Sequence, residues 1–195
     1  MKQTLRTLPL LAAFALSGCF SFGAKPPPVL MRLTPATTIP ADTSRTVAAG
    51  QAVTVAVPTI PQELATTRVP VRTGSTAVAY VKDAQWVEPP GTLFERLLSE
   101  TIAATTGRVV LDPRQFAFDP GVRLTGQLQA FGIDGDAMQA VVVYDAALAR
   151  GGNSIETRRF EAHVPIAAVN AATVAPALNQ AANQVAADVA RWIGN

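Results

Sequence analysis

The stretches VRLTGQLQAFGI (residues 122–133), AMQAVVVYDAALAR (137–150) and SIETRRFEAHVPI (154–166) decide the fold. Along much of their length, apolar and polar side chains alternate, which is typical of β-strands with one buried face. The segments between them are Asp134-Gly135-Asp136 and Gly151-Gly152-Asn153, and both favour tight hairpin turns. The sequence therefore predicts an antiparallel meander of three strands.

Two amphipathic helices are expected outside this meander. Residues 92–105 carry one apolar stripe, with Thr92 and Glu95 at the spacing of a capping box and Gly107 as the stop signal. Residues 173–193 form an Ala-rich pattern with apolar steps of three and four, in which Pro176 is tolerable only in the first turn. Its polar positions, which we expect to face water, are Asn179, Asn183, Gln184, Asp188 and Arg191.

Shorter segments complete the predicted fold. Residues 61–65 predict a single helical turn, and Gly74-Ser75 predicts a hairpin turn. Further strands are expected at 29–33, 51–57, 69–72, 77–82 and 108–111. Strands segregated from two helices predict an α+β fold, in which an antiparallel β-sheet with a C-terminal meander is packed by two amphipathic helices.

The N-terminal residues indicate export. Residues 1–7 carry two positive charges, and LPLLAAFAL (8–16) is an apolar run too short to span a bilayer. The following Leu16-Ser17-Gly18-Cys19 resembles the bacterial lipobox, in which the cysteine thiol accepts a diacylglycerol. The alternative is that Cys19 is a small buried hydrophobic residue. The charged start and the absence of another cysteine favour lipidation.

These features predict three parts of the chain. Residues 1–18 are a lipoprotein signal peptide, residues 19–28 are a lipidated N-terminus with a Pro-rich tether, and residues 29–195 form one domain. We expect Cys19 to carry a diacylglycerol and an N-acyl chain such as palmitate, and we expect no other cofactor. Because Phe20 follows the cysteine where inner-membrane lipoproteins usually carry Asp, similarity to that sorting system implies the periplasmic face of the outer membrane.

Composition argues against several classes of function. Two of the 16 basic residues lie in the first 18 positions, so the remaining 14 balance the 14 acidic residues, which gives no electrostatic reason to expect nucleic acid. His163 is the only histidine and lies on the polar side of a predicted strand, so we expect it to be solvated rather than catalytic. Asp134 and Asp136 suit a turn better than a calcium loop. No metal site and no enzymatic activity are expected.

The order of several residues resembles the ABC-type transport auxiliary lipoprotein family. Tyr80, Trp86 and Pro89 precede an amphipathic helix, and Asp112-Pro113 follows the next strand. The aromatic pair often found in the first strand of the family is replaced by Leu30-Met31. The resemblance implies an accessory lipoprotein that works with a mammalian-cell-entry (MCE) domain protein, a permease and an ATPase in lipid traffic between the two membranes. It is also compatible with a homo-oligomer around the MCE assembly.

Two kinds of surface are expected to meet such a partner. One is the loop that contains Trp86, Glu88, Pro89 and Pro90, and the other is an exposed edge of the sheet. For Trp86 the alternative is a place in the core, which is also expected for Trp192. Two other functions remain open from the sequence: direct lipid carriage in an apolar cavity between sheet and helices, and an envelope hydrolase.

Overall fold

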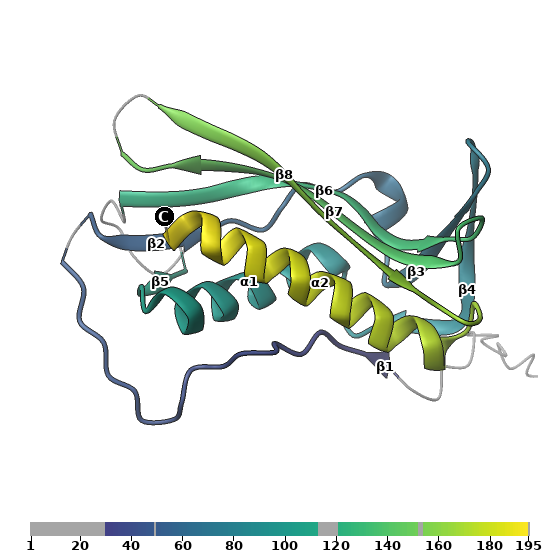
Figure 1. Ribbon diagram of the computed structural model, residues 1–195, viewed down its shortest axis with the longest axis horizontal. Helices are drawn as coiled ribbons and strands as arrows, with labels where there is room; N and C mark the ends of the chain where they lie inside the picture. The colour runs from purple at the N-terminus through teal and green to yellow at the C-terminus, as the bar shows by residue number, and fades with distance from the viewer. Residues whose placement is uncertain (1–29, 49, 113–120, 152–153, 195) are drawn as a thin grey trace, which may run out of the picture.

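One mixed sheet of eight strands and two α-helices make up the fold (Figure 1). The computed structural model describes residues 30–48, 50–112, 121–151 and 154–194. In chain order the elements are β1 (Leu30–Met31), β2 (Ala52–Val55), the 3-10 helix η1 (Gln62–Leu64), β3 (Arg68–Thr73), β4 (Ala77–Trp86), α1 (Pro90–Thr106), β5 (Val110–Leu111), β6 (Gly121–Asp134), β7 (Gln139–Ala149), β8 (Ile155–Pro165) and α2 (Ala171–Gly194). The predicted α+β class with two helices is confirmed.

Strand β6 is the centre of the sheet. Along one side it pairs with β7 in antiparallel register, and β7 pairs with β8 in the same way, so the predicted meander is confirmed. Its other side is shared by two strands: β2 runs parallel to the first half of β6, and β3 runs parallel to its last residues. On this side β4 joins the sheet through β3, and β5 joins it through β2. The sheet therefore divides into two branches beyond β6.

The sheet is mixed rather than antiparallel throughout. The parallel pairs join β1 to β4, β2 to β5, β2 to β6 and β3 to β6. Parallel neighbours need long crossover connections, which here include α1 and several loops. Local alternation of side chains cannot reveal such pairings, because it reports the buried face of a strand but not its neighbour.

Helix α1 begins earlier than expected and without the predicted capping box. Its N-cap is Pro89, which makes no side-chain cap, and Pro90 occupies the first turn, where a missing N–H is tolerated. The Glu95 carboxylate instead accepts a hydrogen bond from the Ser99 hydroxyl at 2.9 Å. The predicted stop is confirmed, since Gly107 adopts a left-handed conformation with φ of 70°.

Helix α2 also begins earlier than its predicted start at Thr173. The Asn170 side-chain oxygen accepts hydrogen bonds from the backbone N–H groups of Ala172 and Thr173, as an N-cap residue does. Pro176 therefore lies inside the helix, beyond the first turn in which it was expected. Buried alanines such as Ala181 and Ala182 form much of the face that packs against α1 and the sheet.

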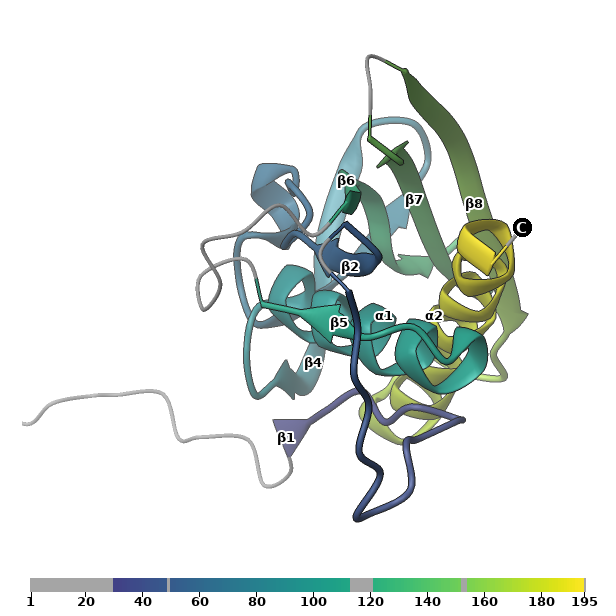
Figure 2. The same cartoon turned by 90° about the vertical axis from the view of Figure 1, so that its left-hand side faces the viewer.

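The space between the sheet and the helices is filled by a single core. Aromatic rings meet edge to face there: the ring of Phe94 lies 5.3 Å from that of Tyr144 and 6.3 Å from that of Phe131. Leu98 and Leu178 add aliphatic side chains with no exposed surface. Figure 2 shows the curved sheet on one side of the two helices and an extended N-terminal segment on the other.

This extended segment, residues 32–48, is here called the strap. It crosses both helices and is bonded to each of them through their polar side chains. Asn179 and Asn183 of α2 bind its backbone near Thr34 and Ala36, and Glu100 of α1 accepts from the N–H of Ile39 at 2.7 Å. The expectation that Asn179 and Asn183 face water is therefore wrong, because their amides bind the strap.

Candidate interaction surfaces

The predicted lipidation site lies outside the described residues. Leu16, Ser17, Gly18, Cys19 and the tether up to residue 28 all precede Leu30, where the described chain begins. Within the described residues, no helix has both the length and the apolar composition needed to cross a membrane. The lipid anchor on Cys19 therefore stays a prediction of the sequence.

Trp86 belongs to the core, and a partner cannot reach it at this surface. Its side chain is 1% exposed, and its ring packs edge to face on Phe131 at 5.5 Å. The indole Nε1 is buried without a hydrogen-bond partner among the described residues. The contact expected at Trp86 is thus corrected to a packing role: β4 extends to this residue, so its side chain points from a strand into the core instead of from a loop.

The residues after Trp86 form a small surface segment, Val87–Pro89. Val87 is 45% exposed, while its N–H donates to the carbonyl of Met31 at 2.9 Å. The Glu88 carboxylate accepts two hydrogen bonds from the Arg96 guanidinium, at 3.1 and 3.2 Å. Pro90, in contrast, is buried. Of the four predicted contact residues, Glu88 and Pro89 therefore offer surface to a partner, and this surface is held in place by β1 and α1.

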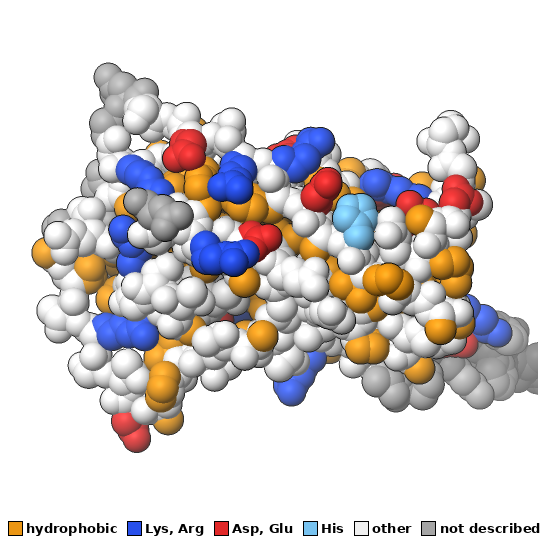
Figure 3. Space-filling view, in the orientation of Figure 1, with side chains coloured by type: hydrophobic (Ala, Val, Ile, Leu, Met, Phe, Trp, Pro, Cys, Tyr) orange, Lys and Arg blue, Asp and Glu red, His pale blue; other side chains and the backbone are white. Residues whose placement is uncertain are grey.

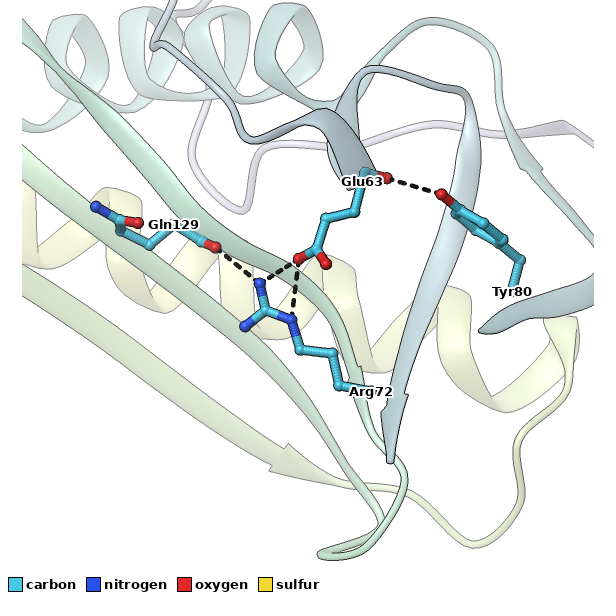
Figure 4. Close-up of polar contacts among 4 residues, drawn as sticks. All are labelled: Glu63, Arg72, Tyr80 and Gln129. Carbon is cyan, nitrogen blue, oxygen red and sulfur yellow. Dashed lines mark hydrogen bonds and ion pairs between the residues drawn. The ribbon is translucent and has the colours of Figure 1, made fainter. Parts of the chain in front are cut away.

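A cluster of polar side chains fixes η1 to the sheet face opposite the helices (Figure 4). The Arg72 guanidinium forms an ion pair with Glu63, to which Nε donates at 2.9 Å, and its Nη2 also donates to the carbonyl of Gln129 at 3.1 Å. The Tyr80 hydroxyl donates to the carbonyl of Glu63 at 3.4 Å, and the Arg68 guanidinium lies 4.1 Å above the Tyr80 ring. Glu63 balances the charge of Arg72, so this cluster is better suited to hold η1 on the sheet, as a structural clamp, than to bind an anion.

A hollow of about 260 Å³ lies next to this clamp. Its lining combines apolar surface from β3, β6 and β7 with a charged rim, and includes Glu63, Pro70, Arg72, Gly132, Asp134 and Val141. The volume is below the range of about 300–1,000 Å³ that is usual for small-molecule pockets. This hollow could not be predicted from the sequence, because its lining residues come from four separate segments of the chain.

A β-bulge connects the clamp to a second charged group. The register of β6 against β7 shifts between Leu128 and Ala130, which leaves Gln129 as the additional residue. Its side-chain amide donates to Asp145 Oδ2 at 2.9 Å, while Arg159 donates to both oxygens of Asp145 at 2.6 and 2.7 Å. The hydrogen bond from Arg159 is the main reason why the pKa of Asp145 lies below its ordinary value.

The described residues hold no arrangement that suggests catalysis or metal binding. No group of three or more His, Cys, Asp and Glu side chains in the described ranges could hold a metal ion. His163 is exposed on β8, as expected. Tyr144 is buried, which raises the pKa of its hydroxyl, and this hydroxyl donates to the carbonyl of Thr125 at 3.0 Å. Asp134 accepts hydrogen bonds from the N–H groups of Asp136 and Ala137, as the turn interpretation predicted.

The fold defines a class of protein: a small α+β domain with a filled core, in whose described part no cluster of His, Cys, Asp and Glu side chains could hold a metal ion. The family model of the ABC-type transport auxiliary lipoprotein component matches residues 33–190, and the chain belongs to this family. The resemblance seen in the sequence is thus confirmed. The protein is an auxiliary lipoprotein of an ABC-type transport system in the cell envelope, and its family is not a family of enzymes.

Solved structures support the fold. A Xanthomonas campestris protein of the family DUF330 superposes with a TM-score of 0.70 at 19% identity, covering 85% of this chain and 94% of that protein. An uncharacterized protein reaches a TM-score of 0.64 at 18% identity, covering 76% of this chain and 96% of its own. No curated protein matches the chain.

Proposed function

We propose that the protein is a periplasm-facing outer-membrane lipoprotein that docks to the MCE-domain protein of an ABC transport system for lipids. The match of the auxiliary family over residues 33–190 is the observation that carries this proposal. The lipobox at Leu16–Cys19 supplies the anchor, and Phe20 after the cysteine favours the outer membrane over the inner one. A permease and an ATPase complete the proposed system.

The structure favours docking over direct lipid carriage. A lipid carrier of this fold would need an apolar cavity between the sheet and the helices, but core side chains such as Phe94, Leu98 and Tyr144 occupy that space. The hollow beside Arg72 lies on the opposite face of the sheet and is too small for a lipid molecule with two acyl chains. Surface segments held by the fold, such as Val87–Pro89, suit recognition of a protein.

Site-specific photo-crosslinking in intact cells tests the proposal. A photoreactive amino acid replaces Glu88 in the full-length protein, and a matched variant carries it at Gln184, an exposed position of α2. After irradiation, the crosslinked proteins are purified through a tag and identified by mass spectrometry. We expect an MCE-domain protein to be captured from position 88 and much less of it from position 184.

Two outcomes would overturn the proposal. One is efficient crosslinking from position 88 to proteins that belong to no ABC transport system. The other is an MCE protein that is absent both from these crosslinks and from complexes purified out of mildly solubilised envelopes. Co-purification of phospholipid with the protein, in amounts close to one molecule per chain, would instead favour lipid carriage.

A further inference from the structure

One edge of strand β8 pairs with no strand in the described part of the chain. Among the described strands it pairs with β7 alone, and this pairing runs from Ile155 to Pro165 without a register shift. Eleven residues is about twice the mean length of a strand in globular proteins. An edge strand of this kind exposes a row of unpaired backbone N–H and C=O groups, which can pair with another strand.

This edge lacks several of the features that prevent pairing, although it carries the charged side chains of Glu156, Arg158, Arg159 and Glu161. It carries no bulge and no lysine, and its only proline is its last residue, Pro165. At the other end, Ile155 is 68% exposed, the highest value among the exposed large hydrophobic side chains of the described residues. Figure 3 shows acidic and basic side chains next to one another on this side of the molecule.

The sequence of β8 is complementary to itself when it is reversed. If two copies pair in antiparallel register about Phe160, Ile155 lies opposite Pro165 and Arg159 lies opposite Glu161. Two-fold symmetry then gives the Arg159–Glu161 pair twice, together with contact between the two Phe160 side chains. This register also uses the full strand, so on the order of ten backbone hydrogen bonds can form.

The neighbouring registers that keep each side chain on its own face are unfavourable. Moving the centre to residue 159 places Arg159 opposite Arg159, and moving it to residue 161 places Glu161 opposite Glu161. Like charges directly opposite one another destabilise a strand pair. Among these three registers, the charge pattern therefore favours the one about Phe160, and a second copy of this chain supplies the complementary charges.

Arg159 can also bind Glu161 of a second copy, because its contacts within the chain do not use all of its N–H donors. Its Nε and Nη2 atoms donate to Asp145, while Nη1 carries two further N–H donors. The side chain is 61% exposed and is held on the open face of the sheet, the face that Glu161 shares. On the other face, a hollow of about 510 Å³ between β8 and α2 lies beside Phe160 and gives room for partner side chains.

We propose that the protein forms a two-fold dimer in which β8 pairs with β8 of a second copy, in antiparallel register about Phe160. The two sheets then continue through the interface as one. This inference does not depend on the proposed function, because it concerns the purified protein alone. A failure of dimerisation would leave docking to an MCE protein intact, and the reverse holds as well.

Disulfide crosslinking tests the register. In the full-length protein, Thr157→Cys and His163→Cys together place two cysteines opposite each other in the dimer, and oxidation should give a covalent dimer on a non-reducing gel. Within one chain these positions lie about 20 Å apart along the strand, too far for an internal disulfide. Each single variant is the matched control, since identical positions of the two copies are also about 20 Å apart and should not crosslink.

Charge reversal provides the second test. Arg159→Glu and Glu161→Arg each place like charges opposite each other, so each should raise the dissociation constant of the dimer about tenfold or more in analytical ultracentrifugation. The double variant restores opposite charges and should recover most of the affinity, a rescue that loss of folding would not allow. Circular dichroism of each variant verifies that the chain is folded.

The proposal is overturned if the double-cysteine variant forms no covalent dimer under full oxidation while the charge variants sediment like the unmodified protein. It is also overturned if the cysteines crosslink to a different protein in cells and not to a second copy. In that case β8 accepts a strand from another partner.

Discussion

The side-chain amide of Asn183 donates a hydrogen bond of 2.9 Å to the carbonyl of Thr34, a residue 149 positions earlier in the chain. The oxygen of the same amide accepts from the N–H of Ala36 at 2.7 Å. One side chain therefore supplies both a donor and an acceptor to the strap backbone, as a neighbouring strand would. The strap leads from β1 across the helices, so these bonds fix the N-terminal part of the domain against α2.

Replacing Asn183 with alanine should release this part of the strap. Asn183→Ala removes both bonds to the strap, and we expect a loss of about 1–2 kcal/mol in the free energy of unfolding. Hydrogen exchange measured by mass spectrometry should show faster exchange at Ala36, whose N–H loses its acceptor. Gln184→Ala, at the exposed neighbouring position, is the control and should leave this exchange unchanged. Unchanged protection in Asn183→Ala would show that other contacts hold the strap.

The ion pair between Asp145 and Arg159 should make stability depend on acid pH. The pKa of Asp145 is lowered in the folded state from an ordinary value of 3.8, so the stabilisation is present above that value and is lost as the pH falls through the lowered pKa. The unmodified protein and Asp145→Asn should therefore differ in free energy of unfolding by urea at pH 7, and this difference should shrink as the pH falls below the ordinary pKa of 3.8. Arg159→Met should show the same convergence. If the difference in free energy of unfolding is as large at pH 3 as at pH 7, it does not arise from the ion pair between Asp145 and Arg159.

Local patterns predicted the fold where one segment alone carries the information. The alternation in β7 and β8 reports one buried face, so both strands are found within two residues of their predicted ends. Of the turn predicted at Gly151-Gly152-Asn153, residues 152 and 153 lie outside the described residues. Gly107 likewise marks the end of α1 by its own conformation. Pairings such as Val71 with Ile133 depend on residues far apart in the chain, and no periodicity encodes them.

For the predicted surface residues, too, local sequence patterns did not reveal contacts with distant parts of the chain. Asn179 and Asn183 occupy polar positions four residues apart, a spacing that is equally typical of a solvated helix face. Only the path of the strap reveals their acceptors and donors. Trp86 had two interpretations for a similar reason: the sequence places an indole before two prolines but does not show how far β4 extends.

The two tryptophans should respond differently to the loss of the indole N–H. Trp86 Nε1 is buried without a partner among the described residues, whereas Trp192 Nε1 donates to Glu156 at 2.6 Å. Trp192→Phe therefore loses a charge-assisted hydrogen bond of about 1.5–3 kcal/mol, while Trp86→Phe loses only packing. Trp86→Ala should cost about 3–5 kcal/mol because it leaves a cavity. Urea denaturation measures all three, and an equal cost for the two Phe variants would contradict the assignment.

A single methyl group at Gly132 should weaken the junction of β3 and β6. A Cβ atom there would lie 2.5 Å from the carbonyl oxygen of Pro70, which is too close for any real contact. Gly132→Ala must therefore move one strand away from the other, at a cost of about 2 kcal/mol or more. Gly194→Ala is the matched control, because its Cβ would meet Thr106 at an ordinary 3.6 Å. Equal thermal stability of the two variants would show that the strands adjust freely.

Anchoring should depend on the sulfur atom of Cys19. Diacylglycerol transfer needs a thiol, so Cys19→Ser should leave the chain unacylated and without the hydrocarbon that contributes about 0.8 kcal/mol per buried methylene. We expect the variant to move from the membrane pellet to the soluble fraction and to incorporate no radiolabelled palmitate, whereas Ser21→Ala should stay in the pellet and be labelled. Density-gradient separation of the two membranes should place the unmodified protein with the outer membrane. If Cys19→Ser still sediments with membranes and neither form takes up palmitate, then the interaction with the membrane arises from the domain itself or from its partners.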